Sequence, residues 1–495
     1  MIDERSLDLF KKRLVPVPRE MEFFDDELFH IKNGCQVELI APAGMESTVV
    51  ANFRNYWKAE PQITYQAGGE GIKAEGYHLS VNESRIRIEA ADINGVRNAL
   101  KTVRQLAEPE RGVLYFSEYI VTPCEIKDEP ALAFRGIHLC WFPETPAFEI
   151  EKQIRLAAYF KFNAVVLEPW GIFPYESHPE FCWQDHVVPR GEFKRLIALG
   201  RELGVTLIPQ INLFGHAAWS RIASAKHAIL DFHPELQSLF EPDGWSWCLT
   251  NPETIKILTD LVCELHEFFD NPPYFHIGFD EAHDAFSCAA CRKVNLEDTI
   301  AGHIKKFHDL LASRGARTLM WHDMLLTEGD PRWKGYYAFG NPDTPGLLER
   351  LPKDMILCDW EYNYPHSEDQ TEPDWRTSLY LRDQGFDVFV CPWLSVEGTI
   401  SFGRMAAREK LAGYLMTTWH MNHSWNMVKE FLYGSMVAWR GEDCHLKDIA
   451  FRSAGQCAMA PLIRQVVWDM GITDYRQTGT SQNQISCYST PEVYA

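Results

Sequence analysis

The sequence predicts an α/β protein: a (β/α)8 TIM barrel preceded by an N-terminal α+β domain and followed by a short helical C-terminal extension. The main observation is a change of rhythm near residue 133, after which short apolar runs alternate with amphipathic helical patterns. There are eight such runs, and eight strand–helix repeats indicate a closed barrel rather than an open sheet. The runs are residues 134–140, 162–168, 205–212, 274–281, 317–323, 354–362, 386–393 and 413–420.

The elements between and before these runs support the same division. Residues 191–204, "GEFKRLIALGRELG", predict a barrel helix that stops at Gly204. Residues 77–91 alternate polar and apolar side chains and predict two short strands joined by a turn, and residues 94–108 predict a helix with one apolar face. We therefore expect an α+β scaffold domain at 1–125, the barrel at 126–440 and the helical extension at 441–495.

Length, charge and cysteine content narrow the class of protein. A chain of 495 residues exceeds what one hydrophobic core usually serves. Its formal charge of −21 repels nucleic acid and anionic membrane surfaces, which favours a neutral small-molecule or oligosaccharide substrate. No signal peptide or run of about 20 apolar residues is seen, so we expect a cytoplasmic protein, and a homodimer stays open. The 13 cysteines are odd in number and scattered, which predicts reduced thiols.

Polar and aromatic residues gather at the ends of the apolar runs, where a parallel barrel carries its chemistry. Tryptophan rings around carboxylates are typical of sugar-binding surfaces, although single Trp and Tyr residues also cap large cores. The candidates, in run order, are Arg135 within the first run, Glu168, Asn212 and His216, Asp280 and Glu281, Trp321 with His322 and Asp323, Trp360 and Tyr362, Trp393, and Trp419 with His420.

The adjacent carboxylates of Asp280 and Glu281 raise a specific chemical question. Neighbouring residues of a strand point in opposite directions, so these two should not form the facing acid and nucleophile of an ordinary retaining glycosidase. If the substrate supplies its own nucleophile, such as a 2-acetamido group, one carboxylate can protonate the leaving oxygen while the other holds the acetamide N–H. The structural alternative makes Asp280 a helix N-cap and Glu281 a first-turn residue.

Several motifs resemble one enzyme family. "HIGFDE" is similar to the His-x-Gly-x-Asp-Glu signature of glycoside hydrolase family 20, the β-N-acetylhexosaminidases. "YHLSVNESRIRIEAADINGVRNALKTVRQL" resembles that family's N-terminal domain, and "FRG", "IPQINLFGH" and "LTNPET" resemble its barrel segments, so the resemblance runs from about residue 75 to about 440. "LEPWGIFPYESHPEFCW", "DWEYNYPH" and "MTTWH" look closest to the hexosaminidase D branch.

The resemblance implies an exo-acting retaining enzyme that releases terminal β-linked N-acetylgalactosamine or N-acetylglucosamine by substrate-assisted catalysis, without a cofactor. It implies that Asp280 orients the acetamido group and that Glu281 is the general acid/base. Further implied roles are hydroxyl binding by Arg135, bracing by His216, donation to the acetamido oxygen by Tyr362, and pocket walls of Trp321, Trp360, Trp393 and Trp419.

Two departures from the family pattern put hydroxyl recognition and epimer preference in doubt. Phe279 replaces the usual second glycine of the signature, and Met421 stands where many members have a glutamate, a role that Glu168 or His420 could take. Two rival functions therefore stay open: a sugar-binding barrel without activity, and a β-glycosidase that uses its own carboxylate nucleophile.

The motif "CAAC", Cys288 to Cys291, is weak evidence for a metal. A structural zinc needs four ligands, and the sequence shows no second pair at a telling spacing. We therefore expect reduced loop thiols and no metal.

Overall fold

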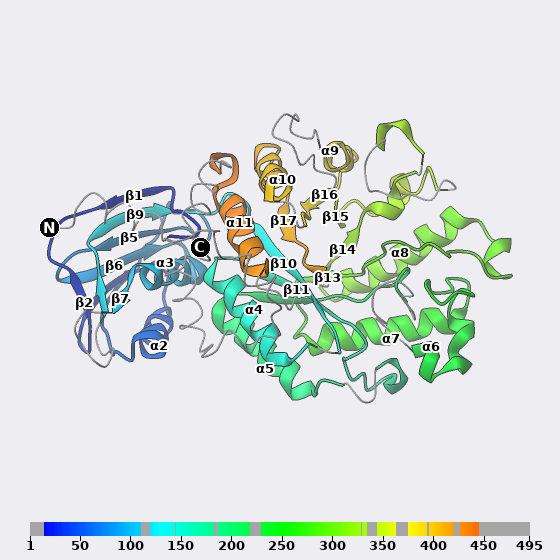
Figure 1. The fold of residues 1–495 in the computed structure, drawn as a ribbon, viewed down its shortest axis with the longest axis horizontal. Coiled ribbons are helices and arrows are strands. Elements are labelled where there is room, and N and C mark those ends of the chain that lie inside the picture. The colour runs from blue at the N-terminus through cyan, green and yellow to red at the C-terminus, as the bar shows by residue number, and fades with distance from the viewer. Residues whose placement is uncertain are drawn as a thin grey trace, which may run out of the picture. The chain divides into compact units, whose positions relative to one another are not determined.

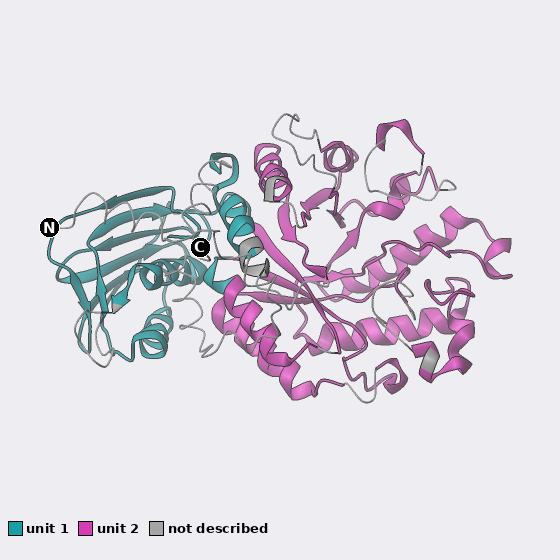
Figure 2. Cartoon of the chain, in the orientation of Figure 1, with its two compact units in different colours: residues 1–133, 158–161, 424–495 teal, residues 134–157, 162–423 magenta. Residues whose placement is uncertain are grey.

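A computed structural model describes residues 14–109, 119–143, 145–182, 187–217, 229–327, 329–333, 344–362, 375–393, 396–419 and 426–444. The chain divides into two compact units (Figure 2). Unit 1 comprises residues 1–133, 158–161 and 424–495, and unit 2 comprises residues 134–157 and 162–423. The predicted limits at 125 and 440 stay predictions, and most of the predicted extension lies outside the described residues.

Unit 1 is built on a six-stranded sheet. Its order is β1 (Glu20–Phe23), β9 (Cys124–Asp128), β5 (Tyr77–Val81), β6 (Arg85–Ala90), β3 (Gln36–Ile40) and β4 (Gln62–Gln66). The first four strands are antiparallel, whereas β3 runs parallel to β6 and β4. The predicted strand pair at 77–91 is thus confirmed as β5 and β6.

Two helices and a small second sheet are also present between residues 14 and 133 of unit 1. The helices are α2 (Glu46–Trp57) and α3 (Ile93–Leu106), and the small sheet has the order β2 (Phe29–Ile31), β8 (Tyr119–Val121), β7 (Glu108–Pro109). Helix α3 confirms the predicted helix, and it starts where the Asp92 carboxylate accepts the N–H groups of Asn94 and Gly95. Its apolar face, which includes Val96, Leu100 and Val103, is buried in the unit's core.

Unit 2 contains the predicted barrel. Eight parallel strands follow the order β12 (Thr206–Pro209), β11 (Ala164–Pro169), β10 (Phe134–Trp141), β17 (Gly413–Met416), β16 (Asp387–Val390), β15 (Ile356–Asp359), β14 (Arg317–Trp321) and β13 (Tyr274–His276). A parallel bridge between Gln210 and His276 joins the two ends of this order. Each of the eight apolar runs supplies one strand, which confirms the (β/α)8 architecture.

Helices occur between most successive strands (Figure 1). They are α4 (Ala147–Tyr159), α5 (Arg190–Leu203), α6 (Ile229–Phe232), α7 (Pro252–Phe268), α8 (Leu296–Ser313), α9 (Arg376–Asp383) and α10 (Val396–Arg408), and α11 (Asn426–Arg440) follows β17 and belongs to unit 1. Helix α5 ends as predicted, with Gly204 in the left-handed conformation at φ 74°.

Short 3-10 helices shape the connections. They are η1 (Pro179–Phe181), η2 (Pro234–Leu239), η3 (Cys291–Lys293), η4 (Asp323–Leu325), η5 (Pro331–Trp333), η6 (Leu348–Arg350) and η8 (Gly441–Asp443). Among the described residues, no helix combines the length and the apolar character that crossing a bilayer requires.

The barrel interior is apolar near the amino ends of the strands. Phe134 stacks on Phe389 with ring centroids 4.1 Å apart, within a cluster that includes Val166, Ile208 and Leu415. Polar side chains follow at the carboxyl ends, so the packed interior forms the floor beneath the candidate site.

Candidate active site

Asp280 and Glu281 lie in the segment that follows β13, and both reach one histidine. The Nε2 atom of His216 is 3.3 Å from Oδ2 of Asp280 and 3.3 Å from Oε2 of Glu281. Asn212 donates from Nδ2 to Oδ1 of Asp280 at 3.3 Å. Asp280 is buried, whereas the Glu281 side chain is 34% exposed, so one carboxylate is enclosed and the other can meet an incoming molecule.

The two carboxylates do not point in opposite directions as strand alternation predicts. Strand β13 ends at His276, and the backbone then takes left-handed φ values of 85° at Phe279 and 47° at Glu281. Left-handed residues break the alternation of side chains, which turns both carboxylates toward His216. The N-cap alternative is also wrong, because the next helices in the chain are η3 and α8, far beyond Glu281.

Two glycines allow the segments after the third and fourth strands to touch. A Cβ atom on Gly278 would lie 1.8 Å from Oδ1 of Asn212, and one on Gly215 would lie 2.0 Å from the carbonyl oxygen of Asp280. Any side chain at either position would force the two segments apart. Glycine therefore brings Asn212 and His216 to the carboxylates.

The segment after the fifth strand adds a third carboxylate. Oδ2 of Asp323 accepts the Glu281 N–H at 2.9 Å, and its Oδ1 accepts the Trp360 indole N–H at 3.0 Å. Burial, together with the nearby charge of Asp280, raises the pKa of Asp323 well above its usual range. Asp323 thus fixes the backbone of Glu281 and the ring of Trp360.

The four predicted tryptophans and Tyr362 form one continuous aromatic group. The Trp419 indole N–H donates to the Tyr362 hydroxyl at 2.7 Å, and its ring centroid is 5.5 Å from that of Trp321. The Tyr362 ring lies 5.3 Å from both Trp360 and Trp393. These rings come from strands five to eight, so the wall curves around one half of the barrel mouth.

The Tyr362 hydroxyl is positioned to act as a donor in this wall. It lies 3.1 Å from Oγ1 of Thr417, and burial raises the pKa of Tyr362 well above its usual range, with a smaller contribution from the charge of Asp280. The phenol therefore keeps its proton at all physiological pH values.

Glu168 lies deeper, at the end of β11, beside two residues of β10. Its Oε2 is 3.3 Å from Nε2 of His138 and 3.4 Å from Sγ of Cys140. The His138 ring contacts Trp419 at 4.8 Å and Trp321 at 5.4 Å, so Glu168 sits behind the aromatic wall. Burial lowers the pKa of the neighbouring His276, which helps to keep that ring neutral.

The position of Arg135 does not support its predicted role. It is the second residue of β10, at the amino end of the strand, where its N–H donates to Asn163 at 2.9 Å and it pairs with Tyr414. His138 of the same strand faces the interior, and strand alternation turns Arg135 to the other side. Hydroxyl binding by Arg135 stays a prediction, and His420 and Met421 lie outside the described residues.

Asp323 was a candidate at the end of the fifth run without an assigned role, and two further site residues carried too weak a signal in the sequence. His138 occupies an inward position of a run that reads as plain core. Trp245 lies in a long connection, yet its ring centroid is 4.5 Å from that of His216 and its indole N–H donates to the Glu281 carbonyl.

Comparison with known families finds one match in the barrel and one in the N-terminal part of the chain. The family description "Glycosyl hydrolase family 20, catalytic domain" matches residues 182–377, and "Glycosyl hydrolase family 20, domain 2" matches residues 11–129. The chain belongs to glycosyl hydrolase family 20. The catalytic match includes Asp280, Glu281 and every connecting segment from the third strand to the sixth, and the second match covers the sheet of unit 1.

Two curated relatives of this family 20 chain are named β-hexosaminidases. The β-hexosaminidase of Vibrio furnissii is 26% identical over 438 residues, which are 77% of this chain and 62% of that protein. The β-hexosaminidase of Porphyromonas gingivalis is 25% identical, covering 51% of this chain and 36% of its own length. This chain therefore spans less than two thirds of both relatives.

Solved structures of the family share the fold. The exo β-N-acetylglucosaminidase of Vibrio harveyi, in complex with N-acetylglucosamine, superposes with a TM-score of 0.69 at 17% identity, covering 95% of this chain and 79% of the other. The N-acetyl-β-hexosaminidase of Streptomyces plicatus gives a TM-score of 0.66 at 15% identity and covers 94% and 96%.

Proposed function

We propose that this family 20 chain is an exo-acting, retaining β-N-acetylhexosaminidase that uses the 2-acetamido group of its substrate as the nucleophile. The observation that carries the proposal is the geometry of the two carboxylates. An enclosed Asp280 and a half-exposed Glu281 meet at one imidazole, inside an aromatic wall. Family membership and the names of the relatives support the same substrate class.

The enclosed carboxylate suits the acetamido group. Asp280 is fixed by Asn212 and His216 and is buried away from water, so its charge would interact strongly with a developing positive charge. It would accept the acetamide N–H and balance the charge of the cyclised intermediate. Tyr362, which keeps its proton, would donate to the acetamido oxygen.

The half-exposed carboxylate suits proton transfer. Glu281 would protonate the leaving oxygen and later remove a proton from water. Its backbone is held by Asp323 and by Trp245, and its carboxylate oxygen contacts His216. The rings of Trp321, Trp360, Trp393 and Trp419 would stack on the sugar.

The same geometry disfavours the rival with its own nucleophile. Double displacement needs two carboxylates on opposite sides of the anomeric carbon. Here one imidazole lies 3.3 Å from an oxygen of each carboxylate, so His216 bridges the two groups that would have to face the sugar from opposite sides. The non-catalytic rival predicts binding without turnover, and it is tested by activity.

The first experiment uses nitrophenyl glycosides of N-acetylgalactosamine, N-acetylglucosamine and galactose. Turnover of the acetamido sugars alone is expected, with preference for the galacto epimer because the sequence resembles the hexosaminidase D branch. Equal hydrolysis of the plain galactoside would contradict substrate assistance, and sugar binding without any hydrolysis would contradict the proposed activity.

The second experiment measures inhibition by a thiazoline that mimics the cyclised acetamide. The wild type should bind it about 10²-fold or more tightly than the product sugar, because it resembles the intermediate. Asp280→Ala should lose most of that advantage, whereas the matched variant Glu281→Gln, which keeps Asp280, should retain it. Equal affinities of thiazoline and free sugar in the wild type would overturn the mechanism.

A further inference from the structure

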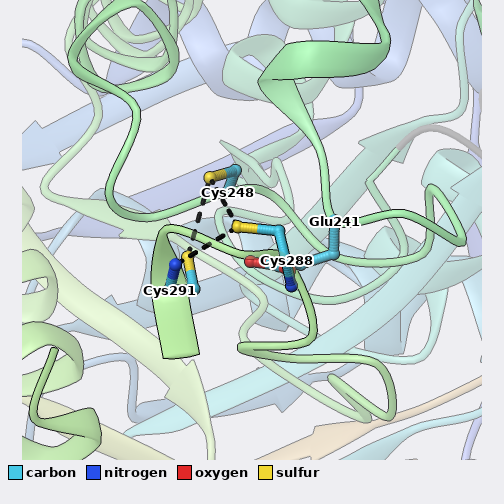
Figure 3. A group of neighbouring side chains, drawn as sticks. All are labelled: Glu241, Cys248, Cys288 and Cys291. Atoms are coloured by element: carbon cyan, nitrogen blue, oxygen red, sulfur yellow. Dashed lines mark hydrogen bonds between the residues drawn. The ribbon is translucent and has the colours of Figure 1, made fainter. Parts of the chain in front are cut away.

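Three cysteines and a glutamate come together beside the active-site segments (Figure 3). They are Cys288 and Cys291 of the "CAAC" motif, with Glu241 and Cys248 from the connection after the third strand. One ligand atom from each lies within 4.8 Å of the others. The sequence offered only the Cys-x-x-Cys pair, and the fold supplies the two ligands that were missing.

The distances between these sulfur atoms fit tetrahedral coordination. Sγ of Cys248 is 3.8 Å from Sγ of Cys288 and 3.6 Å from Sγ of Cys291. Two thiolates bound tetrahedrally to zinc at about 2.3 Å lie about 3.8 Å apart. The Cys291 N–H also points to Sγ of Cys288 at 3.3 Å, a turn that aims both thiols of the pair at one point.

Packed thiols alone would show similar sulfur distances, so the decisive observation is the burial of the Glu241 carboxylate beside them. Its side chain is 1% exposed, and Oε2 accepts from the Cys288 N–H at 2.6 Å and from the Ser287 hydroxyl at 3.2 Å. Its Oε1 is buried with no hydrogen-bond partner among the described residues, and no ion pair joins Glu241 to a lysine, arginine or histidine in that part of the chain. A buried carboxylate is stable when it is paired or coordinates a metal.

We propose that Cys248, Cys288, Cys291 and Glu241 bind one zinc ion. Three sulfurs and one carboxylate oxygen are a ligand set that zinc accepts in a closed tetrahedral site, and soft thiolates exclude magnesium and calcium. No water position is needed to complete four ligands, so the site is structural rather than catalytic.

The zinc would clamp two loops that carry site residues. The Glu241–Cys248 loop includes Trp245, which contacts His216, and Trp247, whose indole N–H donates to the Asn212 carbonyl at 2.9 Å. The loop ending at Cys291 begins directly after Glu281. Joining both loops through one ion would hold Trp245 against the carbonyl of Glu281.

The experiment measures metal content of the full chain, produced without a histidine tag. Mass spectrometry of wild type is expected to find close to one zinc per chain. Cys288→Ser, Cys248→Ser and Glu241→Gln should each lower the occupancy about tenfold or more after dialysis, because each removes a ligand. Cys182→Ser and Cys263→Ser, which lie outside the cluster, should keep it.

Cobalt substitution gives an independent readout that does not depend on enzyme activity. The cobalt form should show an intense thiolate-to-metal charge-transfer band, which Cys291→Ser weakens and Cys263→Ser leaves intact. Zinc-free wild type that also fails to take up zinc or cobalt would overturn the proposal. A disulfide between Cys248 and either cysteine of the motif in freshly purified protein would overturn it as well. Failure of the proposed hexosaminidase activity would leave these metal readings unchanged.

Discussion

The buried charges of unit 1 and those of the barrel site are satisfied in different ways. In unit 1 the fully buried Lys161 ammonium donates to Oδ2 of Asp128 at 3.0 Å and to the Tyr77 hydroxyl at 2.8 Å. In the barrel the carboxylates of Asp280 and Glu281 face an imidazole. In unit 1 the buried cation and the buried anion neutralise each other. In the barrel the group that contacts both carboxylates is an imidazole rather than a lysine or arginine, so their negative charge can act on a substrate.

The unit 1 network is complete at every polar atom that the structure describes. The other oxygen of Asp128 accepts from the Trp439 indole at 2.8 Å, and the Tyr77 hydroxyl also contacts Thr102 at 2.6 Å. The Lys161 ammonium lies 4.6 Å from the Trp439 ring centroid. Such a network stabilises one packing arrangement and has no group left for a ligand.

The barrel site keeps unsatisfied polar groups. The Trp321 indole N–H and Oε1 of Gln210 are buried without hydrogen bonds to described residues. Left-handed backbone occurs in both regions: His216, Glu281 and Trp419 have φ values between 46° and 54°, and Lys161 of the unit 1 network has a φ of 63°. The comparison indicates that the buried charges of unit 1 stabilise its fold, whereas the carboxylates of the barrel site are placed to interact with a substrate.

The largest effect expected from this contrast is on catalysis. Glu281→Gln should lower kcat on a glycoside with a poor leaving group by about 10²–10⁴-fold, because the proton donor is lost. The melting temperature should hardly change, since the Glu281 side chain is part exposed. Kinetics and thermal denaturation measured on the same preparation test both points, and full activity in the variant would refute the acid/base role.

The matching change in unit 1 should affect stability and leave chemistry intact. Lys161→Met leaves Asp128 buried without its cation, which should lower the free energy of unfolding by about 3–5 kcal/mol. The control is Lys73→Met, which removes an exposed partner of Glu129 and should cost below about 1 kcal/mol. Urea denaturation provides the values. Equal effects of the two variants would show that the buried network contributes no more than a surface pair.

The third test concerns the pH dependence of stability and His303, a histidine that contacts the segment carrying Asn212. His303 of α8 is buried, contacts the Leu213 carbonyl at 3.0 Å, and burial lowers its pKa to about 4. Below pH about 6.5 the unfolded chain binds a proton that the folded chain does not, so stability should fall by about 3 kcal/mol as pH drops to about 4. In the variant His303→Gln the free energy of unfolding should no longer fall by this amount between about pH 6.5 and about pH 4. The same pH dependence in variant and wild type would contradict the lowered pKa of His303.

The smallest expected effect belongs to Asp323. Because the pKa of Asp323 is raised, the folded chain retains a proton that the unfolded chain has released above its ordinary pKa. Stability should therefore decline as pH rises through that window, and Asp323→Asn should remove this part of the decline. The variant also loses one of two acceptors, at a cost of about 1 kcal/mol. Denaturation at pH 5 and pH 8 separates the two contributions, and parallel curves for variant and wild type would contradict the raised pKa.

The sequence alone determined the barrel and most of the site's composition. The eight apolar runs need no tertiary information, because each is a local pattern with turns on either side. The ends of parallel strands gather at one face of a barrel, so the strand-end positions of Asp280, Trp321, Trp360 and Tyr362 were enough to predict that they come together.

Only the tertiary structure decided how the side chains are aimed and which loops meet. The turn of Glu281 toward His216 depends on left-handed backbone after β13, which strand alternation cannot predict. Which face of β10 is inward, as His138 shows, was also decided by the closed barrel. Glu241 and Cys248 join Cys288 and Cys291 through packing between two loops about 40 residues apart in the chain. Contacts between distant irregular segments leave no local pattern in a sequence, because no helical or strand period relates their residues.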